Sequence, residues 1–428
     1  MNTVDKAQYG AWRRNLALLL GEVVFFFVGL AFIDLSTVLP VFVKKLVKSD
    51  EIVGLILGLR AVMLLLPQFL MPHLLAHRAF AKPLLLALGA IGRLSILGYG
   101  LYMYNFGGRN PHIDLAFFIA AFLLFMLMDG AVWAPWTAIV ERSLPPEPRA
   151  WFFGAIVTIT ALASLLPALV VDRLLSKGAD SQTYGILFLC FAGAGFVSWL
   201  CILGIREQPR TGIYDEPLRF RSYLIELADT FRTDVPFRKL FLGLACMNAF
   251  GIASTFYVLD AESIWKSDSW VGKYLIASQV GGAVAGLLWI GIRRQWGART
   301  ALLCLGAVAL LAPATAIATR LVSPWAFTAP FVLQGMIGVG AWSLAMGYMI
   351  ENFPSDPRQV IRIGALNALT AISAGLPILG GALKDRFGSI PMYAVATVIC
   401  LIGLVTMARA TTVPRTAPVR TPTADQTS

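Results

Sequence analysis

Charged residues are scarce in this sequence of 428 residues, in which Asp, Glu, Lys and Arg make up 14% and hydrophobic residues 57%. Because an ordinary soluble domain is about one quarter charged, this composition excludes a water-soluble fold. The apolar stretches also lack the period-two alternation of barrel strands, which excludes a membrane β-barrel. Long apolar runs remain, and a run of about 20 such residues crosses a bilayer as a helix.

Sequence motifs for catalysis and for metal binding are missing as well. The 3 histidines and 5 cysteines show no HExxH or CxxC spacing, so the cysteines are interpreted as small buried apolar residues. No Walker A sequence, GxSxG motif or dinucleotide fingerprint is present. We therefore expect no enzymatic activity, no ATPase and no cofactor.

Twelve apolar runs predict an all-α membrane protein with twelve transmembrane helices. The first run is too long for a signal peptide, so we expect it to be retained, with the mature chain starting at or near Met1. The predicted spans are 15–42, 52–75, 83–104, 114–139, 151–173, 184–205, 237–261, 270–292, 299–320, 325–349, 360–383 and 391–409.

The net charge of +11 has a distribution that predicts orientation. Lys and Arg gather in the loops and tails of one side, most of all in residues 206–236, and such loops stay in the cytoplasm. We therefore expect both termini in the cytoplasm, in the bacterial inner membrane or a membrane derived from it. The expected partners are the lipid bilayer and a small solute or ion, with no nucleic acid; membrane-protein partners are unknown.

Three short patterns occur twice, at a spacing of about 210 to 218 residues. Residues 48–54 (KSDEIVG) return as 266–272 (KSDSWVG). Segments 141–149 and 351–358 both begin with Glu and end with Pro-Arg, and both precede a helix that contains a proline and ends in Asp-Arg. An offset of six helices returns the chain to the same side of the membrane. The halves are therefore predicted to be parallel repeats around an axis along the membrane normal.

This organisation resembles the major facilitator superfamily over nearly the whole chain, which implies two six-helix bundles related by pseudo-two-fold symmetry. The loop after span eight is similar to the superfamily's glycine-arginine signature, whereas the loop at 77–83 lacks the usual aspartate. The resemblance implies a gating role for both loops. The residues concerned are Arg78, Lys82, Gly291, Arg294, Gly297 and Arg299.

A narrower resemblance rests on residues 32–43 and 66–68. They are similar to a bacterial branch of the superfamily that includes MamH-like proteins of the magnetosome membrane. This resemblance implies iron transport into magnetosomes for magnetite biomineralisation. The metal would need hard oxygen ligands, and the candidates are Glu22, Asp34 and Asp129.

Four parts of the chain are predicted: bundles at 1–205 and 237–409, a cytoplasmic linker at 206–236 and a disordered tail at 410–428. Apolar residues recur at helical spacing between 220 and 231. This pattern indicates either an amphipathic helix on the membrane surface, with arginines facing anionic headgroups, or a plain connector. The tail is rich in Thr and Pro, which is typical of disorder.

Ionisable side chains inside spans are costly unless paired or hydrated, so each is a functional candidate. At about 1.5 Å per residue, Asp34 and Arg60 both lie about 12 Å below the outer ends of neighbouring spans, which predicts an ion pair. Glu22, Arg93 and Asp129 fall in the inner half, which favours a second cluster there.

Two interpretations of these charges stay open. By the resemblance, the first and fourth helices line a central cavity, so Glu22, Asp34 and Asp129 would face the substrate path. A carboxyl group desolvated between helices can exchange protons near neutral pH, as a proton-coupled symporter or antiporter requires. Alternatively, the charges only neutralise one another. Asp260 is expected in water at the outer mouth. In the C-terminal half the pathway candidates, for which packing is the alternative, are Asn248, Tyr257 and Gln334.

Three classes of protein fit this sequence. The leading hypothesis is a secondary active transporter that moves a small solute by alternating access. A second is a non-transporting membrane sensor or scaffold, favoured by the incomplete loop at 77–83. The third is a drug or metabolite exporter, which would need a large pocket lined by aromatic residues.

Overall fold

The computed structural model describes residues 11–76, 78–209, 220–353 and 358–410. This part of the chain is helical almost throughout. Ten of its helices are long and apolar enough to cross a membrane. The prediction of an all-α membrane protein is confirmed. The ten helices and the twelve predicted spans differ in number because one helix contains two spans and another span is divided between two shorter helices.

Helix α15 (Val271–Thr319) contains 49 residues, about twice what one crossing needs. It combines predicted spans eight and nine and is interrupted at Gly297, where φ is 84°, a conformation that glycine adopts readily. Predicted span two is instead divided into α4 (Asp50–Gly58) and α5 (Arg60–Ala76), each too short to cross alone. With both features counted, the described chain makes twelve crossings.

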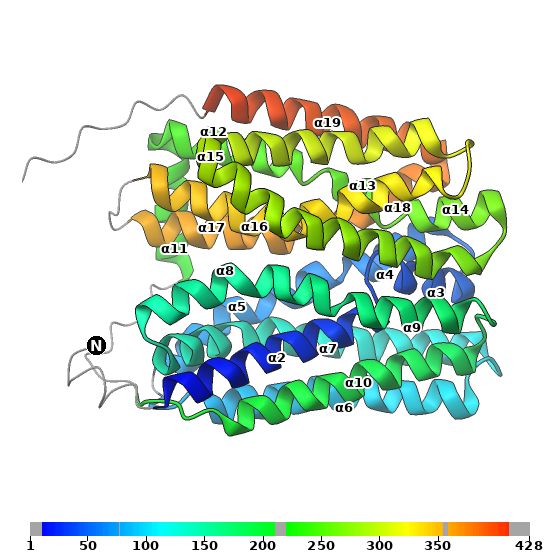
Figure 1. Cartoon of the computed structure of the whole chain (residues 1–428), viewed down its shortest axis with the longest axis horizontal. Helices are drawn as coiled ribbons and strands as arrows, with labels where there is room; N and C mark the ends of the chain where they lie inside the picture. Colours follow the sequence, from blue (N-terminus) through cyan, green and yellow to red (C-terminus); the bar gives the residue numbers. More distant parts are fainter. Residues whose placement is uncertain (1–10, 77, 210–219, 354–357, 411–428) are drawn as a thin grey trace, which may run out of the picture.

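The remaining elements form two bundles, which lie one above the other in Figure 1. The N-terminal half also contains α2 (Trp12–Phe32), α3 (Val38–Leu46), α6 (Lys82–Phe106), α7 (Pro111–Ser143), α8 (Pro146–Ala163), α9 (Leu165–Leu175) and α10 (Ser181–Gly204). The C-terminal half also contains α12 (Val235–Met247), α13 (Phe250–Ser254), α14 (Tyr257–Trp265), η1 (Asp268–Trp270), η2 (Ala326–Thr328), α16 (Ala329–Asn352), α17 (Arg358–Ser373), α18 (Leu376–Phe387) and α19 (Ser389–Ala410).

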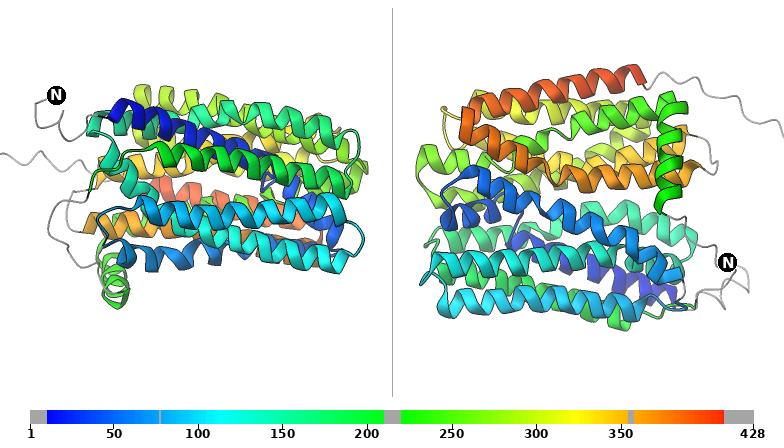
Figure 2. Two further views of the ribbon diagram at one scale, coloured as in Figure 1. Left: turned by 90° about the horizontal axis from the view of Figure 1, so that it is seen from below. Right: turned by 180° about the vertical axis from the view of Figure 1, so that it is seen from behind.

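Helix α11 (Phe220–Thr233) lies within the predicted linker and crosses the direction of the spanning helices at one end of the molecule (Figure 2). We call this end, where α2 begins and α19 finishes, the linker end. The opposite end, which holds α3 and α14, is the far end (Figure 1). Most of the predicted tail, residues 411–428, lies outside the described residues, as do linker residues 210–219.

Several predicted spans are broken rather than continuous. The pair α8 and α9 and the pair α17 and α18 are each interrupted shortly before a proline, Pro167 or Pro377. Proline lacks an amide N–H and clashes with the carbonyl four residues earlier, which breaks the helix there. The first span was predicted as one helix over 15–42, and this is wrong, because the chain leaves the helix at residues 33–37.

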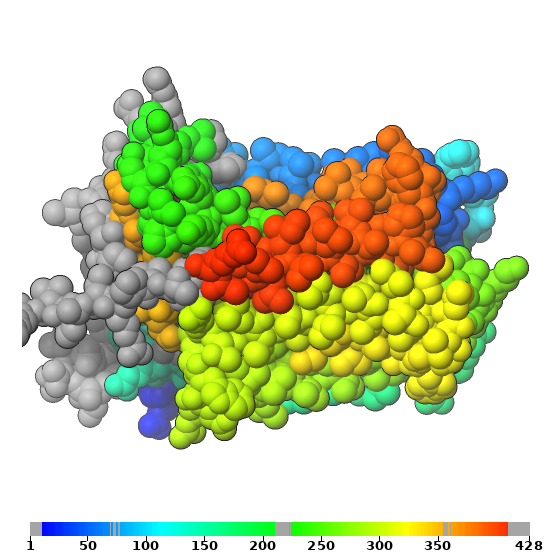
Figure 3. Space-filling view, turned by 90° about the horizontal axis from the view of Figure 1, so that it is seen from above, coloured from blue at the N-terminus to red at the C-terminus, as the bar shows by residue number. Residues whose placement is uncertain are grey.

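Apolar side chains cover the outward side of the bundles. Figure 3 shows α19 and the second part of α15 lying over one side of the C-terminal half. Along α19, exposed aliphatic residues recur at helical spacing. This surface suits a lipid environment, since water would disfavour such an apolar face. The residues are Val395, Val398, Leu401, Ile402 and Val405.

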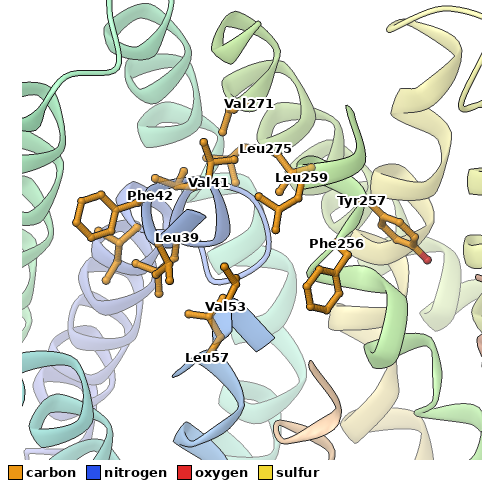
Figure 4. Close-up of a cluster of buried hydrophobic side chains, with 14 of the residues drawn as sticks. Leu39, Val41, Phe42, Val53, Leu57, Phe256, Tyr257, Leu259, Val271 and Leu275 are labelled. Atoms are coloured by element: carbon orange, nitrogen blue, oxygen red, sulfur yellow. The ribbon is translucent and has the colours of Figure 1, made fainter. Parts of the chain in front are cut away.

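At the far end the two halves share one hydrophobic core. Its side chains interdigitate across the boundary between the halves, as Figure 4 shows. Burial of apolar area from both halves stabilises this contact. The labelled residues are Leu39, Val41, Phe42, Val53 and Leu57 from the N-terminal half, and Phe256, Tyr257, Leu259, Val271 and Leu275 from the C-terminal half.

Polar contacts reinforce the same boundary. The carboxylate of Asp385 accepts hydrogen bonds from Ser49 Oγ at 2.5 Å, from the Asp50 N–H at 3.1 Å and from the Glu51 N–H at 2.9 Å. A carboxylate at the N-terminus of α4 is favoured by the helix dipole. Three ion pairs also join the halves here: Lys45 with Asp268, Lys384 with Asp50 and Lys273 with Asp172.

The duplicated KSD segments explain why this boundary is so close. A Cβ added to Gly54 would lie 2.2 Å from the carbonyl oxygen of Pro377, and one added to Gly272 would lie 2.1 Å from the Cα of Asp172. Both contacts join one half to the other. Each repeat therefore supplies a glycine at which the opposite backbone approaches without space for a side chain.

Toward the linker end the hydrophobic cores of the two halves are separate. The ion pairs found there connect residues within one half, together with the adjoining linker. They are Arg142 with Glu207, Arg293 with Glu351, Arg358 with Asp229 and Arg362 with Asp234. The halves are thus held together at the far end and are packed independently at the linker end.

Candidate functional site

One face of α7 changes from buried to accessible along its length. Phe118, Phe122 and Met126 follow this face at intervals of four residues and belong to the core at the far end. Asp129 and Trp133 continue it toward the linker end. Asp129 is partly exposed and Trp133 is 48% exposed.

The same change occurs on α16 in the other half. Phe331 is fully buried in the far-end core. Gly338 and Trp342 lie on the same face of the helix, two and three turns further along. Both are exposed, Trp342 by 39%.

These two faces border one space between the halves. Helix α7 packs mainly against α6 and α5 and touches α8 only slightly, and α16 packs mainly against α15 and touches α17 only slightly. The flanking helices make the contacts between the halves, α5 with α17 and α8 with α15. We therefore treat Asp129, Trp133, Gly338 and Trp342 as one inter-half surface, which opens toward the linker end.

Glu22 of α2 anchors a polar cluster beside this surface and is itself only 7% exposed. Its carboxylate accepts hydrogen bonds from Trp136 Nε1 at 2.8 Å and from Ser198 Oγ at 3.4 Å. Arg93 donates to the same Ser198 Oγ at 3.1 Å and interacts electrostatically with Glu22 and Asp129. The structure thus joins Glu22 and Arg93 through Ser198, and Asp129 lies within electrostatic range of both.

The predicted ion pair between Asp34 and Arg60 is not formed. Asp34 lies in the break between α2 and α3, where its Oδ1 accepts hydrogen bonds from the N–H groups of Ser36 and Thr37, both at 2.9 Å. Its side chain therefore stabilises the turn that precedes α3. Two buried guanidinium nitrogens of Arg60, Nε and Nη1, have no hydrogen-bond partner among the described residues, and the two charges interact only at longer range.

The metal-ligand candidates do not converge either. Glu22 and Asp34 are twelve residues apart in the chain, which corresponds to about 18 Å along a helix. Asp129 interacts electrostatically with Glu22, on another helix. Within the described ranges no group of three His, Cys, Asp or Glu side chains is placed to hold a metal ion.

The neutral candidates of the C-terminal half occupy different places. Asn248 lies half-buried at the break after α12. Tyr257 is 0% exposed and packs its ring against Phe331 and Tyr393, at centroid distances of 5.9 and 5.5 Å. Gln334 is buried, and its Oε1, like the Tyr257 hydroxyl, has no hydrogen-bond partner among the described residues. Tyr257 therefore serves packing.

Asp260 is not solvated, contrary to prediction. It is 1% exposed, and Arg320 binds it through two hydrogen bonds of 3.0 Å. Ser389 Oγ donates a third at 2.6 Å and Tyr393 a fourth at 3.3 Å. The carboxylate is fully satisfied inside the C-terminal half, so it connects α14, α15 and α19 rather than lining a mouth.

In the loop before α6, for which a gating role was predicted, a carboxylate from outside the loop accepts the hydrogen bonds of the backbone. Glu207 accepts hydrogen bonds from the N–H groups of Ala81 at 2.8 Å and Lys82 at 2.9 Å, and it forms an ion pair of 2.9 Å with Arg142. It thereby satisfies free N–H groups at the start of α6. Lys82 Nζ donates to backbone carbonyls after α10, whereas Arg78 is exposed.

The residues of the C-terminal half for which a gating role was predicted lie on one short stretch of α15. Gly291 and Arg294 are helical, and only Gly297 breaks the helix, so the predicted loop between spans eight and nine is shorter than expected. An open depression of about 430 Å³ is lined by Arg293, Arg294, Gly297, Glu351 and their neighbours. Arg299 Nη2 donates to the Ala408 carbonyl at 3.2 Å.

Sequence reasoning missed three contributors to this region: Trp133, Ser198 and Asn367. Trp342 Nε1 donates to Asn367 Oδ1 at 3.0 Å. The duplicated segments contained a usable signal, because Trp133 and Trp342 precede the matching residues Glu141 and Glu351 by eight and nine residues.

No family model matches the sequence, and neither does any curated protein. Solved structures do match. The nucleoside transporter NupG aligns with a TM-score of 0.68 over 92% of this chain and 98% of its own, at 12% identity. The D-xylose-proton symporter aligns with a TM-score of 0.65 over 93% and 97%, at 12% identity.

The human organic anion transporter MFSD10 aligns with a TM-score of 0.64 over 92% of this chain and 99% of its own, at 15% identity. All three are transporters of the major facilitator type. The chain has the major facilitator fold. Since these identities are low, the likeness establishes the major facilitator fold alone. The similarity to these three structures does not support the magnetosome branch or iron transport.

Proposed function

We propose that this protein is a secondary active transporter that moves a small solute by alternating access. The observation that supports this best is the inter-half surface, which is sealed into a shared core at the far end and accessible toward the linker end. A carrier needs this asymmetry, because its path must open to only one side at a time.

The orientation follows from charge. By the positive-inside rule, the linker end faces the cytoplasm, and both termini lie there. The structure then corresponds to a state open to the cytoplasm. The opposite state requires the polar contacts around Asp385 and the far-end core to separate while the linker end closes.

We propose that transport is coupled to protons through Glu22 and Asp129. These carboxyl groups share the charge of one arginine, Arg93, so the cluster reaches neutrality when one of them binds a proton. Arg93 and Ser198 hold the cluster in place. Whether the exchange runs as symport or antiport depends on the cargo.

Iron is the cargo that the site supports least. The three carboxylates proposed as ligands do not meet, and Asp34 is occupied by hydrogen bonds to the backbone of its own turn. The sensor or scaffold hypothesis would require a sealed centre, whereas Trp133 and Trp342 are accessible. An exporter of aromatic compounds remains the second candidate, because accessible tryptophans border the inter-half space.

The test is accumulation by proteoliposomes under an imposed pH gradient, with uridine, D-xylose, p-aminohippurate, ethidium and ferrous iron as labelled solutes. We expect at least one organic solute to accumulate. Glu22→Gln and Asp129→Asn should abolish gradient-driven accumulation but retain solute exchange, because the path stays intact. Asp229→Asn, which alters an exposed carboxylate of α11, is the matched control.

Undiminished coupling in both variants would remove Glu22 and Asp129 from the mechanism. Failure of the wild-type protein to move any of the solutes, with or without a gradient, would favour the scaffold hypothesis instead.

A further inference from the structure

Two tryptophans stand out on the inter-half surface because they lie at a similar depth in the two repeats, one residue out of register. Trp133 of α7 is 48% exposed and Trp342 of α16 is 39% exposed. They precede Glu141 and Glu351, the matching residues of the duplicated segment, by eight and nine residues. At about 1.5 Å per residue, each tryptophan lies about 15 Å from the linker end of its helix.

Both rings belong to the face that lines the space between the halves, not to a lipid face. Trp133 continues the face of Phe118 and Met126, which is buried in the far-end core. In the far-end part of α7 the exposed residues, such as Ile113 and Leu124, lie on the opposite face.

The neighbours of α16 place Trp342 at the same boundary. Val339 lies on the adjoining face, and a Cβ added to Gly282 would lie 3.1 Å from Val339 and 3.5 Å from Ala161 of the N-terminal half. On its other side, Trp342 donates a hydrogen bond to Asn367 of α17, a helix that contacts α5. Trp342 therefore lies between the two seams where the halves meet.

The orientation of both rings is fixed. Trp133 stacks on Trp136, with ring centroids 5.7 Å apart and planes 26° apart, and Trp136 is itself held by its hydrogen bond to Glu22. Trp342 is fixed through its indole N–H. A ring that is already ordered loses little conformational entropy when a ligand stacks on it.

We propose that Trp133 and Trp342 are the stacking platforms of the cargo site, one from each half, and that the cargo is a planar aromatic or heterocyclic solute. This inference rests on the proposed function and names its class of substrate. The site takes rings that are neutral or carry one positive charge, since Glu22 and Asp129 outnumber Arg93 beside Trp133, and a cation over an indole face is further attracted by the ring.

The alternative is that these tryptophans are anchors at a membrane interface, a common place for the residue. Trp325 at the far end provides the comparison. It is 67% exposed and packs edge-on against Trp270 at 4.9 Å, away from the inter-half surface. If all three tryptophans are anchors, substitution of any one of them should leave solute binding unchanged.

The experiment measures equilibrium binding of ethidium to the full-length protein in detergent by fluorescence anisotropy, without any gradient. Uridine serves as a neutral planar competitor, and tetraethylammonium and D-xylose as non-aromatic competitors. Each of Trp133→Ala and Trp342→Ala should weaken ethidium binding by about tenfold, as expected for loss of one stacking ring. Trp133→Phe and Trp342→Phe should restore most of it, and Trp325→Ala should leave it unchanged.

Two results would overturn the inference. One is saturable ethidium binding that Trp133→Ala and Trp342→Ala weaken no more than Trp325→Ala does, and the other is the absence of saturable binding by both ethidium and uridine. Thermal unfolding of each variant shows whether the alanine forms are folded, and the phenylalanine forms supply the answer if they are not. Tryptophan-dependent binding without proton-driven uptake in proteoliposomes would support this binding site and contradict the transport proposal. Proton-driven uptake without tryptophan-dependent binding would support transport and contradict this binding site.

Discussion

The contact between Asp385 and the start of α4 makes a quantitative prediction about closure of the far end. One carboxylate accepts three hydrogen bonds across the boundary between the halves, two of them from backbone N–H groups. A hydrogen bond to a charged group contributes about 1.5–3 kcal/mol, and solvent exposure reduces this value. Asp385→Asn keeps one acceptor oxygen and removes the charge.

We expect Asp385→Asn to shift the equilibrium toward the state open at the far end by about 1–2 kcal/mol, or about 5- to 30-fold. Hydrogen exchange measures this directly, because the amides of Asp50 and Glu51 donate to the carboxylate. Peptides that cover the start of α4 should exchange faster by that factor. Peptides around Phe256, within the shared core, should follow if the whole boundary separates.

The equivalent contact made by the first repeat supplies an internal control. Asp172 occupies the equivalent position but lies 3.8 Å from Lys273, and its Oδ1 accepts no hydrogen bond among the described residues. Asp172→Asn should therefore change exchange at the start of α15 much less. Equal effects of the two substitutions, or unchanged exchange at Asp50 and Glu51 in Asp385→Asn, would refute the reasoning.

Two further predictions concern close packing and buried charge. Gly272→Ala places a Cβ 2.1 Å from the Cα of Asp172, so it should hold the far end open. We expect faster amide exchange there and near-normal thermal unfolding. Gly193→Ala is the control and should behave like the wild type, because its added Cβ meets nothing within 4 Å. Asp260→Ala leaves the charge of Arg320 without its buried partner and should lower the free energy of unfolding by about 3–5 kcal/mol, measured by denaturation in detergent. Substitution of Asp229, whose ion pair is exposed, should lower the free energy of unfolding by about 1 kcal/mol or less. A similar loss for Asp260 and Asp229 would contradict the expected effect of burial.

Most of the fold could be predicted from the sequence, because lipid leaves few choices for an apolar chain. Runs of about 20 apolar residues must become helices, and the duplicated segments at 48–54 and 266–272 fixed the symmetry. The breaks were harder to place. Pro167 and Pro377 mark two of them chemically, whereas the break at Asp34 depends on a carboxylate turning back to its own backbone.

The candidate site was predictable in part. Buried Glu22, Arg93 and Asp129 attract attention in any apolar span, since such charges are costly. The direction in which a side chain points depends on packing, and this is why Asp260 was wrongly placed in water. The same limit applies to Trp133, since exposure to lipid and exposure to the inter-half space look alike in a sequence.

The position of Glu207 bears on how far the two halves can separate at the linker end. Glu207 is fastened to the N-terminal half through Arg142 and the start of α6, whereas Asp229 of α11 pairs with Arg358 of α17 in the C-terminal half. The covalent tether between these anchors runs from Glu207 to Phe220, and thirteen peptide units extend to about 45 Å at most. The length of this tether sets an upper limit on the distance by which the two halves can separate at the linker end. A shorter tether would reduce that distance without changing any helix.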